Sequence, residues 1–164
     1  MKKALFVVGL IVFVGGCTSY NTEITKDLNG TLSKDYPVKI QLPANGQYDQ
    51  IVYEKSGQMM ANALKTAFKY YASDVSIVTN KSMQLGHESY FVTTDLLHWE
   101  DRATEWSGRR DHITIQIKVF DEKTKTLKSS TIIKGASSWF TFGGDHPQNL
   151  LENPVNKYVE TLYN

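Results

Sequence analysis

The 164-residue sequence contains only one cysteine, and its 18 lysine and arginine residues nearly balance its 17 aspartate and glutamate residues. A single cysteine excludes an intramolecular disulfide bond and any metal site built from several thiolates. A formal net charge of +1 argues against a nucleic-acid partner, because neutralising phosphates requires a basic surface. The composition, 41% hydrophobic and 21% charged, is that of a globular protein, and the length fits one domain.

The N-terminal apolar run is too short to span a membrane. It occupies residues 4–14, whereas a membrane-spanning helix needs about 20 apolar residues. Lys2 and Lys3 precede the run, and Gly15 and Gly16 follow it. A basic start, an apolar run and small residues are typical of a secretory signal, so we predict a signal peptide at residues 1–16.

The lone cysteine stands directly after this segment. Val14, Gly15, Gly16 and Cys17 resemble the lipobox of bacterial lipoproteins. The resemblance implies that Cys17 is lipidated after the signal is cut, and stable anchoring does need at least two acyl chains or signals. Thr18 stands where an aspartate retains enteric lipoproteins, which implies the outer membrane and its periplasmic side. The alternative is an ordinary cleaved signal that leaves Cys17 as a free thiol.

The rest of the chain divides into a polar segment and one domain. Residues 17–34 are predicted to be the lipidated cysteine and a polar tether, with a short strand near 23–28. As a flexible coil, such a tether would span roughly 20–25 Å. Residues 35–164 are predicted to form a single periplasmic domain. Without residues 1–16 the chain has 16 basic and 17 acidic residues, a formal charge of −1.

The hydrophobic pattern predicts an α+β fold: a mainly antiparallel or mixed sheet of four to five strands with two helices packed on one face. Apolar residues alternate with polar ones in the cleanest strand, and recur every three to four residues in the longer helix. The predicted strands are 36–42, 74–79, 88–100, 111–121 and 126–142, with the last three forming an antiparallel meander. The predicted helices are 53–72 and a final one capped by Asn153.

Two segments, 97–111 and 139–151, are rich in chemically versatile side chains. The strings HWEDRATEWSG at 98–108 and FGGDHP at 142–147 resemble a family of small bacterial lipoproteins that is known only as a domain of unknown function. The resemblance carries no activity with it. The element order and the lipobox also resemble the N-terminal domain of TolB, the lipoprotein activators of penicillin-binding proteins and the curli secretion lipoprotein.

These segments offer ligands for a metal ion and groups for acid–base chemistry. The candidates are His98, Glu100, Asp101, Asp145 and His146. If residues 97–101 stay extended, His98 and Glu100 share a face and Asp101 points away. The sequence has no G-x-S-x-G elbow and no closely spaced histidine pair. We therefore predict no catalytic residue, no metal site and no cofactor, with a metal-assisted or acid–base envelope hydrolase as the alternative function.

Tryptophan and arginine dominate binding hot spots, and both are concentrated in the first segment. The candidate partner-binding residues are Trp99, Arg102, Trp106, Arg109, Arg110, Asp145 and His146. The alternative is structural, with ion pairs across a loop and the tryptophans closing the core. The sequence thus predicts an outer-membrane lipoprotein whose non-catalytic domain binds an envelope protein or glycan.

Overall fold

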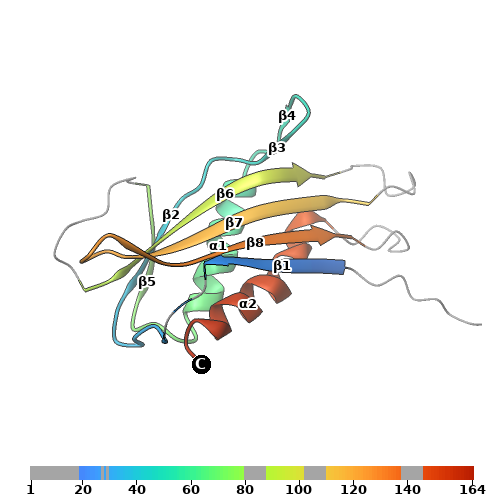
Figure 1. Ribbon diagram of the computed structural model, residues 1–164. Helices are drawn as coiled ribbons and strands as arrows, with labels where there is room; N and C mark the ends of the chain where they lie inside the picture. The colour runs from blue at the N-terminus through green and yellow to red at the C-terminus, as the bar shows by residue number, and fades with distance from the viewer. Residues whose placement is uncertain (1–18, 27, 29, 80–87, 102–109, 138–145) are drawn as a thin grey trace, which may run out of the picture.

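The computed structural model describes residues 19–26, 28, 30–79, 88–101, 110–137 and 146–164, and Figure 1 shows their arrangement. Its strands are β1 (Ser19–Lys26), β2 (Val38–Gln41), β3 (Gln47–Tyr48), β4 (Ile51–Val52), β5 (Val75–Val78), β6 (Tyr90–Glu100), β7 (His112–Asp121) and β8 (Thr126–Ala136). Its helices are α1 (Ser56–Phe68), a short 3-10 helix η1 (Pro147–Leu150) and α2 (Glu152–Thr161). None of the described helices is long and apolar enough to cross a membrane.

The strands form one mixed sheet in the order β1-β8-β7-β6-β2-β5, and β3 with β4 forms a separate small hairpin. The meander β6-β7-β8 is antiparallel, as predicted, and β2 runs parallel to both β5 and β6. The α+β prediction is confirmed, with six strands in the sheet rather than four to five. The hairpin projects from the body of the domain beside β6 (Figure 1).

Both helices cover the same face of the sheet, and the core lies between them and the strands (Figure 1). The core row of β7 comprises four fully buried side chains, Ile113, Ile115, Ile117 and Val119. The apolar stripe of α1 is also buried. The helix ends at Phe68 rather than at the predicted residue 72, so Tyr71 lies beyond it. Tyr71 instead stacks on Tyr163 beyond α2, with ring centroids 5.1 Å apart. The opposite face of the sheet carries the polar residues of β7.

The start of α1 is fixed by the preceding loop rather than by a local cap. Asn45 Oδ1 accepts a hydrogen bond of 3.1 Å from the backbone N–H of Gly57. A Cβ on Gly57 would lie 2.4 Å from the carbonyl oxygen of Pro43, so the close approach of loop and helix requires glycine. The helix begins at Ser56 rather than at the predicted residue 53, because residues 53–55 still belong to the preceding loop.

The segment predicted to be a tether contains the first strand of the sheet. Ser19 to Lys26 pair antiparallel with β8, and Thr131 Oγ1 donates a hydrogen bond to the Glu23 carbonyl. The prediction of a flexible coil is therefore wrong for residues 19–26, and the short strand predicted near 23–28 begins earlier, at Ser19. Because β1 has few apolar residues, it is stabilised mainly by backbone hydrogen bonds to the edge of β8. The local sequence pattern of β1 does not indicate this pairing.

The boundaries of two other elements differ slightly from those predicted. Strand β8 ends at Ala136 rather than at 142, and residues 138–142 lie outside the described part. Helix α2 starts at Glu152, so Asn153 lies in its first turn and is not its cap. Pro154 is tolerated there because the first turn has no intrahelical partner for its missing N–H.

A buried ion pair lies at the end of the sheet away from Ser19, the first residue of β1. Glu122 is fully buried, and its Oε2 lies 2.9 Å from Nζ of Lys39 on β2. The Ser89 hydroxyl donates a hydrogen bond to the same oxygen. These contacts compensate the burial of the carboxylate and tie β2 to the ends of β6 and β7.

Helix α2 is held to the sheet by a buried tyrosine. The Tyr158 hydroxyl donates a 3.0 Å hydrogen bond to Ser129 Oγ on β8. Burial raises the pKa of Tyr158 to about 12 from its ordinary value of 10.0, and the bond to Ser129 offsets part of that effect. Burial also raises the pKa of Tyr163.

We expect the free energy of unfolding to fall as pH rises from about 10 to about 12, because the unfolded chain ionises Tyr158 before the folded chain does. The loss at this site should reach about 2–3 kcal/mol. Urea denaturation at increasing pH should show a shallower decline for Tyr158→Phe than for the wild type. The control is Tyr70→Phe, whose side chain is exposed and should leave the decline unchanged. Identical slopes for both variants would contradict this account.

Candidate functional site

A pocket opens at one end of the sheet, on the face away from the helices. The backbone register places four residues in one row across the strands, and four more in the row next to it. The first row is Glu100, His112, Ala136 and Ser19, and the second is His98, Thr114, Lys134 and Asn21. Side chains in these positions alternate with the core residues of the same strands, so they gather on the open face.

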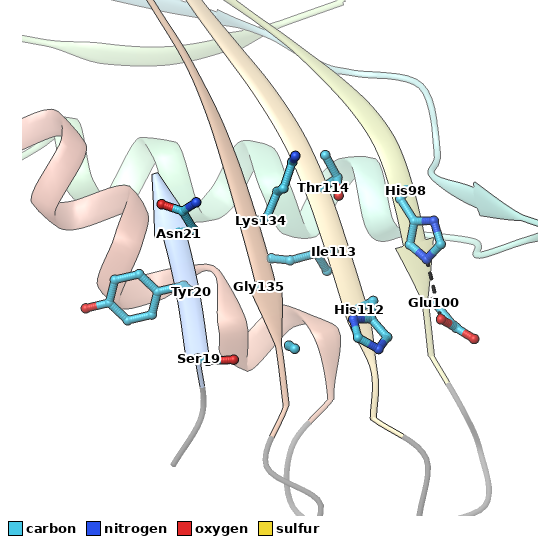
Figure 2. Close-up of a pocket in the computed structure, with 11 residues that line it drawn as sticks. Ser19, Tyr20, Asn21, His98, Glu100, His112, Ile113, Thr114, Lys134 and Gly135 are labelled. Carbon is cyan, nitrogen blue, oxygen red and sulfur yellow. Dashed lines mark hydrogen bonds and ion pairs between the residues drawn. The ribbon is translucent and has the colours of Figure 1, made fainter. Parts of the chain in front are cut away.

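We call this hollow the strand-end pocket; its volume is about 450 Å³ and Figure 2 shows its lining. It is lined by the two rows together with Tyr20, Ile113 and Gly135. The small residues Gly135 and Ala136 form the bottom of the pocket, and longer side chains form its walls. A Cβ on Gly135 would lie 3.1 Å from Ile113 Cγ1, so glycine also lets β7 and β8 pack closely there.

His98 and Glu100 form the side of the pocket on β6. Nε2 of His98 lies 3.4 Å from Oε2 of Glu100, which is only 4% exposed (Figure 2). The sequence prediction that these two share a face is confirmed. A register shift between Leu96 and His98 brings His98 opposite Thr114. The ring of Tyr48, from the hairpin, lies 4.6 Å from the His98 ring and covers it.

The second predicted pair meets nearby. Nδ1 of His146 lies 3.5 Å from Oδ1 of Asp101, and both side chains are partly exposed. The structure thus brings the described candidates together as two pairs, His98 with Glu100 and Asp101 with His146. Within the described ranges, no group of three or more histidine, cysteine, aspartate or glutamate residues is placed to hold a metal ion. Asp145 lies outside those ranges.

The predicted partner-binding residues that the structure describes differ in their exposure. Trp99 is only 2% exposed and belongs to the core, where its Cβ abuts Gly46. The prediction that Trp99 contacts a partner is therefore wrong, and the structural alternative holds for it. Its position in the alternating pattern of β6 points it towards the helices. Arg110 is exposed, as a partner-binding residue must be. Arg102, Trp106 and Arg109 lie outside the described residues.

Of the eleven residues that line the strand-end pocket, only His98 and Glu100 were candidates from the sequence. Ser19, Asn21, His112, Thr114 and Lys134 were not among the candidate site residues, although all five line it. The signal that could have found three of them is the polar side of the alternation in β7 and β8. The two β1 residues could not be found in this way, because their place in the sheet depends on tertiary pairing.

The strand-end pocket has more exposed basic than acidic groups. His98, His112 and Lys134 line it, and Glu100 is its one acid among the described residues. The Glu100 carboxylate is buried beside His98. Threonine, asparagine and serine side chains supply neutral hydrogen-bonding groups. This combination suits reversible binding of a polar or anionic group.

Solved structures of similar fold come from bacteria. The PelC dodecamer from Paraburkholderia phytofirmans matches with a TM-score of 0.62 and 12% identity, covering 89% of this chain and 97% of that one. A PelC variant dodecamer from the same organism matches with a TM-score of 0.64 and 13% identity, covering 88% and 98%. A DUF330 protein from Xanthomonas campestris matches with a TM-score of 0.54 and 13% identity, covering 87% and 93%. At these identities the likeness concerns the fold alone.

These neighbours are not TolB-like, so they do not support the resemblance to TolB that was drawn from element order. That order lacked β1 and the hairpin, both of which the structure adds. A search of curated proteins finds no match. A family model does match residues 31–162, from beyond β1 to the end of α2. The predicted membership of a family without known activity is confirmed: the chain belongs to the DUF4823 family, a domain of unknown function.

Proposed function

We propose that this protein is a lipid-anchored protein of the bacterial outer membrane whose periplasmic domain binds a partner in the envelope without catalysing a reaction. The anchor is a lipid on Cys17, and the domain extends from β1 to α2. The observation that carries the proposal is the lipobox-like run that ends in Cys17, and β1 begins at Ser19, two residues after this proposed anchor.

The start of β1 gives such an anchor a structural consequence. Two residues of extended chain reach at most about 7 Å. A lipid on Cys17 would therefore hold the end of the sheet that contains Ser19 at the membrane surface, rather than at the end of a long tether. Glu100 shares a row with Ser19 three strand spacings away, about 14 Å across the sheet. The whole strand-end pocket would then lie close to the lipid headgroups.

Replacing Cys17 with serine tests the anchor. We expect the Cys17→Ser protein to leave the membrane fraction, and its N-terminal peptide to lack the mass of the acyl chains. Thr18→Asp is the matched control: by the resemblance to enteric lipoproteins it should keep the lipid and move to the inner membrane. A Cys17→Ser protein that stays in the membrane fraction would overturn the anchor.

The exposed apolar surface indicates where a protein partner binds. On the hairpin, Ile51 is 58% exposed and Val52 54%. Leu97, which is 55% exposed, precedes His98, and Tyr48 of the hairpin covers that histidine. We call Tyr48, Ile51, Val52 and Leu97 the hairpin patch. Exposed aliphatic residues that gather on a projecting element are typical of an interaction site.

We infer that the partner bound by this patch is a second copy of the chain. The two PelC neighbours, which share the fold, were solved as dodecamers. In a ring of identical subunits, each copy presents one surface to the next and a different one to the previous copy. A projecting apolar hairpin provides one of these surfaces, and anchoring all copies in one membrane raises their local concentration.

Charge placed on the hairpin patch should break this association. We expect native mass spectrometry of the detergent-purified protein to show oligomers for the wild type and mainly monomers for Ile51→Lys with Val52→Lys. The association should weaken at least about tenfold, since lysines would have to be desolvated in the contact. Gln50→Lys, on the same hairpin and exposed, adds charge without removing the patch and should remain oligomeric. A monomeric wild type would contradict the proposal.

The alternative of an acid–base hydrolase rests on the contact between Asp101 and His146. A carboxylate that accepts a hydrogen bond from one imidazole nitrogen orients the other nitrogen for proton transfer. If the pair is catalytic, His146→Ala and Asp101→Asn should each produce the phenotype of a deletion strain while the purified variants remain folded. Growth that matches the wild type in both strains would leave only the binding function.

A further inference from the structure

We propose that the strand-end pocket binds the phosphate group of a membrane lipid headgroup. The inference deepens the proposed function and rests on it, because it needs the anchor on Cys17 to bring the pocket to a bilayer. It assigns the open face of the sheet a ligand of one chemical class, a phosphodiester. It also gives the basic side chains of the pocket a role that folding does not require of them.

The position of the pocket favours a lipid over a soluble ligand. Ser19 lines the pocket and lies two residues from the anchor. The chain between them spans at most about 7 Å, which is within the thickness of a headgroup layer. A ligand that is present there at very high local concentration needs only weak affinity to occupy the site.

The charges of the pocket suit an anion. Lys134 is exposed, and no ion pair to an acid is formed by it within the described residues. Lys134, His98 and His112 line the pocket together with the small residues Gly135 and Ala136, and Figure 2 shows them on neighbouring strands. Lysine binds phosphate as a point charge, and protonated histidine donates charge-assisted hydrogen bonds. The one acid, Glu100, lies against His98, so a protonated His98 offsets its charge and leaves Lys134 and His112 to attract the ligand.

The neutral side chains complete the site. Thr114 lies opposite both His98 and Lys134, and Asn21 lies opposite Lys134 from the other side. Hydroxyl and amide groups donate to phosphate oxygens or accept from the hydroxyls of a glycerol headgroup. At about 450 Å³, the pocket is large enough for a phosphate and its polar substituent, while the acyl chains stay in the bilayer.

Binding should strengthen as pH falls below neutrality. A phosphodiester keeps its single negative charge, whereas a histidine ring attracts an anion more strongly once it has taken up a proton. His98 and His112 face each other, with ring centroids 6.5 Å apart, and the other titratable groups near them are Tyr48 from β3, Glu100 from β6 and Lys134 from β8.

The test uses the full chain purified from membranes in a non-ionic polyoxyethylene detergent. The probe is glycerophosphoglycerol, the water-soluble headgroup of phosphatidylglycerol, and its binding is followed through the NMR signals of the histidine rings. Glucuronate is titrated in parallel as a sugar carboxylate. We expect saturable binding of the phosphodiester alone, several-fold tighter near pH 5.5 than near pH 7.5.

Variants locate the binding. Lys134→Gln and His112→Gln should each weaken it about tenfold, which corresponds to the loss of one charge-assisted hydrogen bond. Lys125→Gln removes the same charge from the turn at the opposite end of the sheet and should bind as the wild type does. In vesicles of phosphatidylglycerol and phosphatidylcholine, the histidine signals of the lipidated wild type should already show the bound shift.

Each failure has a distinct meaning. If glucuronate binds as tightly as the phosphodiester, or if neither binds, the headgroup assignment is overturned. If the phosphodiester binds but Lys134→Gln and His112→Gln do not weaken it, the strand-end pocket is not the site. The mass of the N-terminal peptide reports the anchor separately. A chain without lipid on Cys17 removes the proposed function, whatever the titrations give.

Discussion

The antiparallel pairing of β1 with β8 is the contact on which the strand-end pocket depends. It brings Ser19 and Asn21 into register with Ala136 and Lys134, and so supplies one side of the hollow. A shift of one residue would turn these side chains to the helix face and bring Tyr20 to the open face. The actual register is supported on the helix side, where Nζ of Lys157 lies 2.7 Å from the Tyr20 hydroxyl.

The two faces of the sheet differ in composition: one is apolar and buried, and the other is polar and open. The helix face buries the isoleucines of β7 and the ring of Trp99, and it provides the hydrophobic stabilisation of the domain. Because both helices pack on that face, the open face can carry polar groups without cost to the core. The same division of faces is compatible with different functions, so the fold shared with PelC and DUF330 proteins constrains the site less than its residues do.

Local pattern predicted the parts of the fold that bury their own apolar residues. The alternation in β7 and the helical stripe of α1 were both visible because each repeats over several turns or pairs. Trp99 shows the limit of residue type as a guide, since a tryptophan suits a binding surface and a core equally well. Its burial follows from the face of β6 on which it lies, and the register shift beside it could not be read from sequence.

The sequence by itself determined the α+β class, the antiparallel meander, the core row of β7 and the pairing of His98 with Glu100 on one face. Each of these depends on contacts between near neighbours or on a repeating pattern. Only the tertiary structure decided that β1 joins the sheet, that Asp101 meets His146, and that two rows of residues from four strands surround one pocket. These features depend on backbone pairing between distant segments, whose register carries little local signal.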